Sequence, residues 1–175
     1  MGQEPFETIV TAHHPEIYRY LRRVTLGASE AEDLAQETFL RAFRAYRRLA
    51  PDANVRAWLF AIATNLRRNH ARAERRRRAA HDNVRSQGRA AVGDGPESEA
   101  LFKEAQAVLE GVVGGLPLRQ RLAFVLRKAH DLSYEEIARG LDCSADSARA
   151  HVFQAFRKIR AGLDGRALPR REGSA

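Results

Sequence analysis

Apolar side chains in this chain recur every three or four residues, the spacing that places them on one face of an α-helix. The pattern begins with Phe6, Ile9, Val10, Ile17, Leu21 and Val24. It returns in every periodic segment that follows, and no segment shows the strict alternation that predicts a half-buried β-strand. The sequence therefore predicts an all-α fold.

Capping and helix-breaking residues divide the amino-terminal part of the chain into three predicted helices. Pro15 is expected to kink the first helix or to start a second one, and Gly27 suits a helix end. Ser29, with Glu32 three residues later, matches a capping box that would open the next helix. A loop over residues 49–54 separates that helix from a third.

The second predicted helix begins with acidic residues and ends with arginines. Its apolar face is predicted to consist of Leu34, Ala35, Thr38, Ala42, Phe43 and Tyr46. A different face carries Asp33, Gln36, Glu37 and Leu40. Acidic residues near the amino end of a helix and basic residues near its carboxyl end complement the helix dipole. This second face can therefore be an ordinary solvated surface. The alternative is a docking surface for a protein, which Leu40 favours because it is a leucine outside the core face.

The third predicted helix passes from an apolar beginning to a strongly basic end. Its inward residues are predicted to be Trp58, Leu59, Ile62, Ala63 and Leu66. Residues 67–78, RRNHARAERRRR, hold seven arginines in twelve positions. Such a run can be a solvated face, but a helix anchored in a core holds its charges in fixed positions, which favours nucleic-acid contact. The formal net charge of +8 also indicates a polyanionic partner.

Helical spacing stops between the two parts of the chain. Residues 79–96 include three glycines and a proline, and their only large apolar side chains are two valines. We therefore predict a flexible linker over 79–96, between one small helical domain at 1–78 and another at 97–163. Residues 164–175 are predicted to form a disordered basic tail.

Two capped helices near the carboxyl end match a helix-turn-helix. Ser133 and Glu136 form a capping-box pattern, and Ser144 is placed to cap the helix that follows. A sharp turn at Asp142 and Cys143 joins the two helices. The last helix is predicted to bury Ala148, Val152, Ala155, Phe156 and Ile159. This layout favours DNA binding through the start of the last helix, with an ordinary helical hairpin as the alternative.

The sequence offers little for catalysis or metal binding. The six histidines are scattered, without an HExxH pattern, and no glycine-rich phosphate loop follows a strand. The single cysteine, Cys143, excludes an intrachain disulfide and a cysteine-cluster zinc site. No run approaches the roughly 18 apolar residues of a membrane span, and the first ten residues lack the layout of a secretion signal. We expect a cytoplasmic protein that is not an enzyme, does not insert into a membrane, and has no metal or cofactor.

Three segments resemble, in this order, the extracytoplasmic-function group of bacterial RNA polymerase sigma factors. The family's core-binding helix is similar to AEDLAQETFLRAFRAY, and the segment after it is similar to VRAWLFAIATNLRRNHARAERRR. Its C-terminal domain is similar to LPLRQRLAFVLRKAHDLSYEEIARGLDCS. The resemblance covers residues 6–163 apart from the linker. It implies two helical domains, sigma regions 2 and 4, that bind core polymerase and direct promoter-specific transcription initiation.

The resemblance also implies roles for individual residues. The clamp helices of the largest polymerase subunit would be bound by Asp33, Gln36, Glu37 and Leu40. The minus-ten promoter element, with one base flipped into the loop, would be bound by Leu49, Asp52, Asn54, Arg56, Asn65, Arg68, Asn69 and Arg72. The minus-thirty-five element would be bound by Ser144, Ser147, Arg149, His151, Gln154 and Arg157. An anti-sigma protein that covers both domains is a further implied partner.

A few positions depart from the family's usual residues. Asp142 stands where glycine is frequent, in a turn that favours a left-handed backbone, and aspartate tolerates this better than most residues. His151 and Gln154 stand where arginine is usual. We therefore expect minus-thirty-five binding to be weaker, less sensitive to salt or different in specificity.

Two other functions remain open from the sequence. One is a stand-alone helix-turn-helix regulator that binds duplex DNA, and the other is an RNA-binding protein that acts without polymerase. The acidic face of Asp33, Gln36 and Glu37, together with a separate arginine-rich helix, favours the sigma interpretation. A single-module repressor needs neither feature.

Overall fold

The computed structural model describes residues 4–25, 27–80 and 97–165, which form seven helices and no strand. The amino-terminal half consists of α1 (Phe6–Val24), α2 (Ala28–Tyr46) and α3 (Val55–Ala80). The carboxyl-terminal half consists of α4 (Glu97–Gly114), α5 (Leu118–Ala129), α6 (Tyr134–Leu141) and α7 (Ala145–Asp164). The predicted all-α fold is confirmed.

The predicted linker and tail fall almost entirely outside the described residues. Positions 79 and 80, which we assigned to the linker, still belong to α3. Both are alanines, which favour helix more than any other residue, so the helix continues past the last arginine. Positions 81–96 and 166–175 lie outside the described residues.

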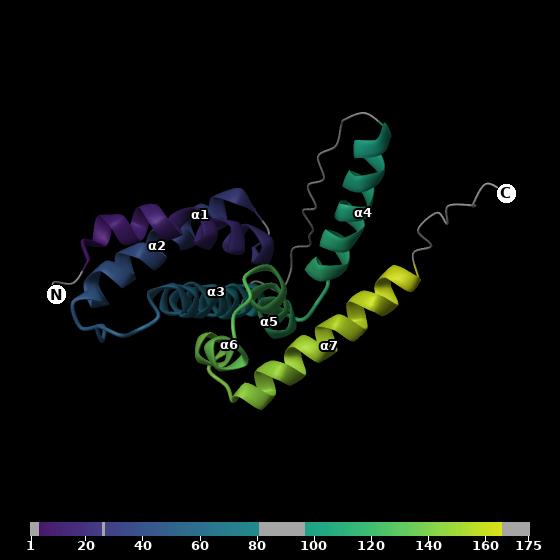
Figure 1. The fold of residues 1–175 in the computed structure, drawn as a ribbon. Helices are drawn as coiled ribbons and strands as arrows, with labels where there is room; N and C mark the ends of the chain where they lie inside the picture. The colour runs from purple at the N-terminus through teal and green to yellow at the C-terminus, as the bar shows by residue number, and fades with distance from the viewer. Residues whose placement is uncertain (1–3, 26, 81–96, 166–175) are drawn as a thin grey trace.

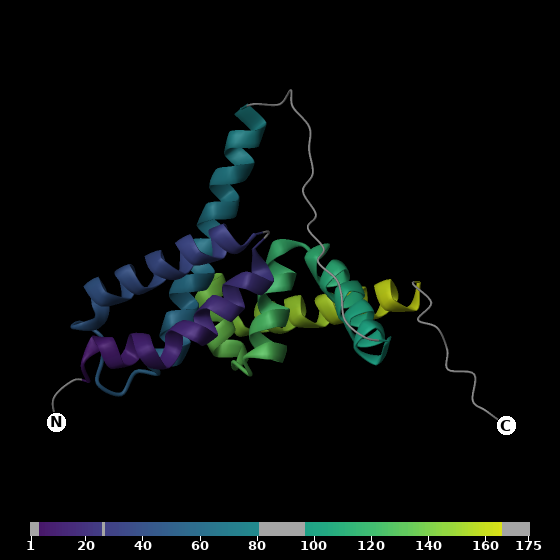
Figure 2. The same cartoon turned by 90° about the horizontal axis from the view of Figure 1, so that it is seen from above.

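Each half has a simple arrangement of packed helices. In the first, α1 and α2 lie side by side and both pack on α3 (Figure 1). In the second, α7 packs against α4, α5 and α6. Figure 2 shows the carboxyl-terminal turns of α3 projecting beyond the other helices of its half. The arginine-rich end of α3 is therefore presented away from α1 and α2.

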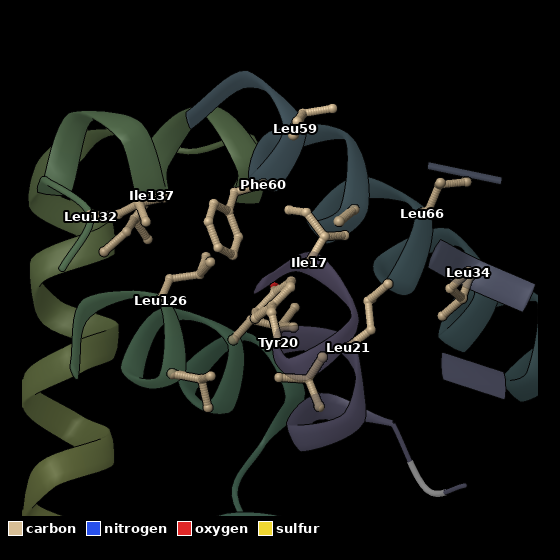
Figure 3. Close-up of a cluster of buried hydrophobic side chains, with 14 of the residues drawn as sticks. Ile17, Tyr20, Leu21, Leu34, Leu59, Phe60, Leu66, Leu126, Leu132 and Ile137 are labelled. Carbon is tan, nitrogen blue, oxygen red and sulfur yellow. The ribbon is translucent and has the colours of Figure 1, made fainter. Parts of the chain in front are cut away.

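One continuous core joins the two halves. Ile17 and Tyr20 of α1 and Phe60 of α3 lie in the same cluster as Leu126 of α5 and Ile137 of α6, and all are at most 1% exposed. Figure 3 shows these side chains gathered where the helices meet. Burying one large apolar side chain contributes about 1.5–3 kcal/mol, so this shared cluster holds the halves together as well as each half internally.

A polar contact inside the core fixes α1 on α3. The hydroxyl of Tyr20 lies 2.8 Å from the hydroxyl of Thr64, and both residues are fully buried. Burial raises the pKa of Tyr20 above its ordinary value, although the contact with Thr64 lowers it in part. The ring of Tyr20 also meets that of Phe60 edge-on, with 5.4 Å between ring centroids.

Helices α3 and α6 approach each other closely at Gly140. A Cβ atom on Gly140 would lie 3.2 Å from Cβ of Thr64 and 3.3 Å from Cα of Ala61. A side chain at this position would force the neighbouring atoms apart, so glycine allows the two helices to touch. The contact joins the amino-terminal half to the first helix of the helix-turn-helix.

The boundaries of the first two helices differ from what the sequence predicted. Helix α1 runs through Pro15, with Ile9 and Ile17 buried on either side of it. Of the two alternatives for Pro15, the start of a second helix is therefore wrong, and the kink stays a prediction. Ser29 does not cap α2, which begins one residue earlier with Gly27 in the capping position. Gly27, which we expected at the end of the first helix, is instead the residue that precedes and caps α2.

Two aromatic residues expected in the core lie at the surface. Phe43 is 61% exposed, whereas Phe39, which we did not place in the core, is only 7% exposed. Phe43 touches α1 through the ring of Phe6, at 5.3 Å between centroids, and this contact covers only part of it. Phe156 is 51% exposed, because Val152 and Ala155 already define the buried face of α7 and Phe156 lies one position beyond it.

The helix-turn-helix has the predicted caps. The amide of Glu136 donates to Oγ of Ser133, and the amide of Ser133 donates to Oε2 of Glu136, which completes the capping box. Ser144 caps α7 by accepting from the amide of Ser147 at 3.1 Å. Asp142 ends α6 with the predicted left-handed backbone, at φ 52°.

Candidate functional site

The exposed face of α2 borders an apolar groove between α1 and α2. The groove has a volume of about 630 Å³, and its lining includes Phe6, Val10, Gln36, Phe39, Leu40 and Phe43. Leu40 is 51% exposed, so it is available at the surface as the sequence predicted. An apolar floor with a polar edge is typical of a surface that binds another protein.

The four predicted docking residues share this side of α2. Gln36 and Leu40 line the groove itself. Asp33 is exposed one turn earlier on the same helix. Glu37 accepts a hydrogen bond from Nε of Arg41 at 2.6 Å, a partly exposed ion pair within the helix. The set therefore forms one continuous patch, with acidic residues beside exposed apolar ones.

The loop before α3 holds three of the residues predicted to contact the minus-ten element. Asp52 is exposed, and Leu49 is half-buried against the core. Asn54 caps α3, since its Oδ1 accepts from the amide of Ala57 at 3.0 Å. Its Nδ2 donates to Oε1 of Glu136 at 2.9 Å, so this side chain also reaches the helix-turn-helix.

Arg56 is held in a charged cluster between the two halves. Its guanidinium donates two hydrogen bonds to the carboxylate of Glu16, and its NH2 donates to the carbonyl of His130 at 2.7 Å. Nδ1 of His130 lies 3.1 Å from Oε1 of the same Glu16. The ring of His130 packs on Phe60, with 4.7 Å between centroids. Arg56, which we predicted to contact the promoter, is thus hydrogen-bonded to residues of α1 and of the end of α5.

The same cluster shifts the pKa values of its members. The hydrogen bond from Arg56 is the largest influence on Glu16 and lowers the pKa of its carboxyl group. Glu16 in turn raises the pKa of Arg56. Burial lowers the pKa of His130, and the nearby carboxylate opposes this only in part. Near neutral pH the cluster therefore holds one ion pair and a neutral imidazole.

Arg67 and Arg68 are buried, in contrast to the other arginines of α3. Nε of Arg67 donates to the carbonyl of Val24 at 3.0 Å, at the end of α1. NH1 of Arg68 donates to the carbonyl of Gly140 at 3.2 Å, and Arg68 is 8% exposed. Arg68 was predicted to contact DNA, and this arrangement places it against α6 instead.

The remaining predicted minus-ten residues are accessible. Asn65, Asn69 and Arg72 are exposed along α3. The four arginines of the next turn, residues 75–78, are exposed as well, on the part of α3 that projects from its half (Figure 2). The structure thus divides the predicted minus-ten set into an accessible group and a group that contacts the carboxyl-terminal half.

The predicted minus-thirty-five residues lie on more than one side of α7. Arg149 is exposed over the ring of Tyr134 at 5.0 Å and pairs with Asp146 at 2.8 Å. Gln154 accepts from Gln120 of α5 at 2.8 Å. His151 lies beside the same end of α5. The exposed members of the predicted set are Ser144, Ser147, Arg149, Gln154 and Arg157.

Sequence reasoning missed the residues that join the two halves. Glu16 and His130 are separated by 114 positions, and no local pattern connects residues so far apart. The burial of Arg67 was also not expected within an arginine run. Its neighbour in the fold is Glu30 of α2, at 3.4 Å between NH1 and Oε1.

Glu30, His70 and Glu74 bring their possible ligand atoms within 4.8 Å of one another. His70 Nδ1 lies 2.9 Å from Oε1 of Glu30. The guanidinium of Arg67 is next to the same carboxylate and already supplies a positive charge there. We therefore assign this cluster to holding the first turn of α2 on α3.

Comparison with known proteins shows the family of this chain. The model for sigma-70 region 2 matches residues 9–77, and the model for sigma-70 region 4 matches residues 107–159. The RNA polymerase sigma-H factor of Pseudomonas aeruginosa is 32% identical over 161 residues, which span 88% of this chain and 83% of that protein. The chain is an extracytoplasmic-function sigma factor.

Two further relatives agree with this assignment. The ECF RNA polymerase sigma-E factor of Escherichia coli K12 is 29% identical over 174 residues, covering 95% of this chain and 88% of that one. The solved structure of the sigma factor RpoE with the anti-sigma factor NepR, from Bartonella quintana, has a TM-score of 0.73 at 24% identity. It covers 91% of this chain and 96% of that one, and the likeness supports the helical fold.

This sigma factor binds core RNA polymerase and directs transcription initiation at specific promoters, as predicted. The alternative of a stand-alone regulator is not favoured. Sigma factors are not enzymes. Among the helices that the structure describes, none is long and apolar enough to cross a membrane.

Proposed function

We propose that the face of α2 docks on the clamp helices of the largest polymerase subunit. Asp33, Gln36 and Glu37 would supply polar contacts, and Leu40 would insert at the edge of the groove. The observation that carries this proposal is the exposed apolar groove of about 630 Å³ beside these residues. Such a groove can bury apolar surface on binding, while the acidic residues fix the orientation of the partner.

We propose that the loop before α3 and the accessible face of α3 bind the minus-ten element. Asn65, Asn69 and Arg72 are exposed and can reach DNA in the arrangement described above. Asn54, Arg56 and Arg68 hold the carboxyl-terminal half through their hydrogen bonds. Their contacts with DNA therefore require the two halves to separate. A base flipped into a pocket near Leu49 and Asp52 would favour the melted strand.

We propose that the start of α7 binds the minus-thirty-five element. Ser144, Ser147 and Arg149 lie in its first turns, the part of a recognition helix that enters the major groove. Arg157 is exposed three turns later and suits a phosphate contact. His151 and Gln154 would contribute at the edge of this surface, because both lie beside α5.

We also propose a protein inhibitor of this sigma factor. The RpoE protein that shares its fold was solved in complex with an anti-sigma factor. An inhibitor that holds the two halves together would keep Arg56 and Arg68 away from promoter DNA. We place the protein in the cytoplasm, with its core polymerase, and propose that it acts by binding alone.

Polymerase binding and promoter-directed transcription test the docking face. The variant carrying Asp33→Ala and Gln36→Ala is expected to lose binding to bacterial core polymerase while keeping its helical content by circular dichroism. A matched control carries Gln106→Ala and Glu110→Ala, which removes one amide and one carboxylate from α4, where the two side chains pair at 2.9 Å. This control is expected to bind core polymerase with wild-type affinity.

Transcription from a genomic promoter library, read by sequencing the transcripts, tests the promoter contacts. Specific start sites are expected with the wild-type protein and core polymerase. If the docking variant kept full polymerase affinity, the proposed face would be wrong. If wild-type protein gave no specific start sites, the assignment of the promoter-binding residues would fail.

A further inference from the structure

A second cavity is lined by residues of α3, of the start of α5 and of α7, and so by residues from both halves. It has a volume of about 310 Å³, within the usual size of small-molecule sites, and its lining includes Arg68, Arg72, Arg75, Arg119, Gln120 and His151. Four guanidinium groups thus line one cavity, three from α3 and one from α5. None of the described residues that line it is acidic.

The positive charges in this cavity affect one another. Burial, followed by the nearby guanidiniums of Arg119 and Arg72, lowers the pKa of Arg68. Burial and the same Arg119 lower the pKa of His151. The positive charge on Arg119 therefore acts on both Arg68 of α3 and His151 of α7. An anion placed between these groups would replace mutual repulsion with attraction.

The beginning of α5 adds to the same positive field. Pro117 occupies the capping position, no side chain caps the helix, and its first turn has no acidic residue. Leu118, Arg119 and Gln120 line the cavity with this first turn. The first amides of a helix have no acceptor within it, and a helix N-terminus carries a partial positive charge that favours phosphate.

His151 provides a polar atom without a partner. Its Nδ1 is buried and makes no hydrogen bond. A buried nitrogen left without a partner costs free energy, which a bound acceptor would recover. Four guanidiniums, the first turn of α5 and the imidazole of His151 therefore line the same small volume.

We propose that this cavity binds a small molecule with a diphosphate or triphosphate group, such as a nucleoside polyphosphate. Arginine pairs with phosphate oxygens through two parallel hydrogen bonds, which suits a multiply charged group. The ligand would bridge Arg72 and Arg75 of α3 to Arg119 of α5. Binding would hold the two halves together and keep Arg68 from DNA. The proposal needs only this arrangement of helices and not the assigned docking face.

A single-residue change in each half tests the cavity. Arg75→Ala removes a lining group from α3, and Arg119→Ala removes one from α5, and neither belongs to the proposed promoter contacts. Arg139→Ala serves as the matched control, because Arg139 is exposed on α6 outside the cavity lining and its loss changes the net charge equally. All three side chains are exposed, so we expect the variants to keep their fold by circular dichroism.

Isothermal titration of the full-length protein with inorganic tripolyphosphate and with ATP measures the affinity at constant ionic strength. Each cavity variant is expected to bind tripolyphosphate roughly tenfold more weakly, the loss of a charged hydrogen-bond pair. The Arg139→Ala control is expected to stay within about twofold of wild type, because Arg139 is exposed to solvent and does not line the cavity, so it makes no direct contact with the bound anion.

Three outcomes would overturn the proposal. Wild-type protein that fails to bind tripolyphosphate rules out the site. A loss in Arg75→Ala without a loss in Arg119→Ala would mean simple attraction to the end of α3. A twelve-residue oligothymidine, titrated in parallel, distinguishes a nucleic-acid backbone from a small molecule. If Arg119→Ala weakened its binding as much as that of tripolyphosphate, the cavity would belong to the DNA path.

Discussion

Replacing Gly140 with leucine should shift the equilibrium between closed and separated halves toward separation while leaving each half folded. A Cβ at this position would meet Thr64 at 3.2 Å and Ala61 at 3.3 Å, and both belong to α3. The nearest atoms thus lie on the other half and not within the carboxyl-terminal half. The added side chain therefore strains the contact between α3 and α6 and not the internal packing of either half.

The size of the effect follows from the geometry. Forcing extra atoms into a packed contact costs about 1–3 kcal/mol. Replacing glycine with leucine inside α6 also recovers up to about 1 kcal/mol of helix propensity, but this gain is the same whether the halves touch or separate. Only the strain in the contact between α3 and α6 changes the ratio of closed to separated molecules. A strain of about 1–3 kcal/mol lowers the ratio of closed to separated molecules by roughly 5- to 150-fold.

Small-angle X-ray scattering measures this change directly, as an increase in the radius of gyration of Gly140→Leu. Gly114→Leu is the matched control, because a Cβ on Gly114 meets nothing within 4 Å. The control should keep the wild-type radius. If Gly140→Leu kept the wild-type radius with full helical content, a side chain at this position would not be enough to open the contact between α3 and α6.

Three further changes test other parts of the fold. Ser133→Ala should lower the free energy of unfolding by about 0.5–2 kcal/mol in a urea titration, because it removes the capping box, whereas Ser29→Ala, which removes no cap, should leave it unchanged. Tyr20→Phe should cost about 1 kcal/mol in the same assay through loss of its buried hydrogen bond. Burial lowers the pKa of His130, so its stabilising effect is complete above the unfolded pKa of about 6.5 and is lost as pH falls below it. The carboxyl pKa of Glu16 is also lowered, so its contribution to stability persists as pH falls to its ordinary value of 4.5. His130→Phe should therefore show a smaller drop in melting temperature between pH 7 and pH 5 than wild type; an equal drop would contradict this assignment.

Local signals predicted the helix-turn-helix well. Ser133, Glu136 and Ser144 cap helices through atoms a few residues away, so the sequence contains all the information that the caps need. The left-handed backbone of Asp142 is likewise a property of one turn. The spacing of apolar residues was enough to predict an all-α fold, because each helix buries one face at its own period.

Features of the fold that depend on residues far apart in the sequence were not predicted correctly. Helix α2 begins at Ala28, before Ser29, and Glu30 in its first turn is paired with Arg67 and His70 of α3, contacts that no local pattern reveals. Phe43 and Phe39 have the same residue type and lie one turn apart, and only the position of α1 decides which is covered. The two-domain division with a flexible linker did not anticipate the core shared by both halves.

The arrangement of the halves separates the two tasks of this sigma factor. The groove between α1 and α2, which we propose as the polymerase-docking surface, is lined only by residues of these two helices, so it stays accessible while the halves are closed. Arg56 and Arg68, in contrast, are hydrogen-bonded to the carboxyl-terminal half. Separation by Gly140→Leu should therefore increase the affinity of the free protein for single-stranded minus-ten DNA and leave its affinity for core polymerase unchanged. Equal changes in both affinities would show that polymerase docking also depends on the separation of the halves.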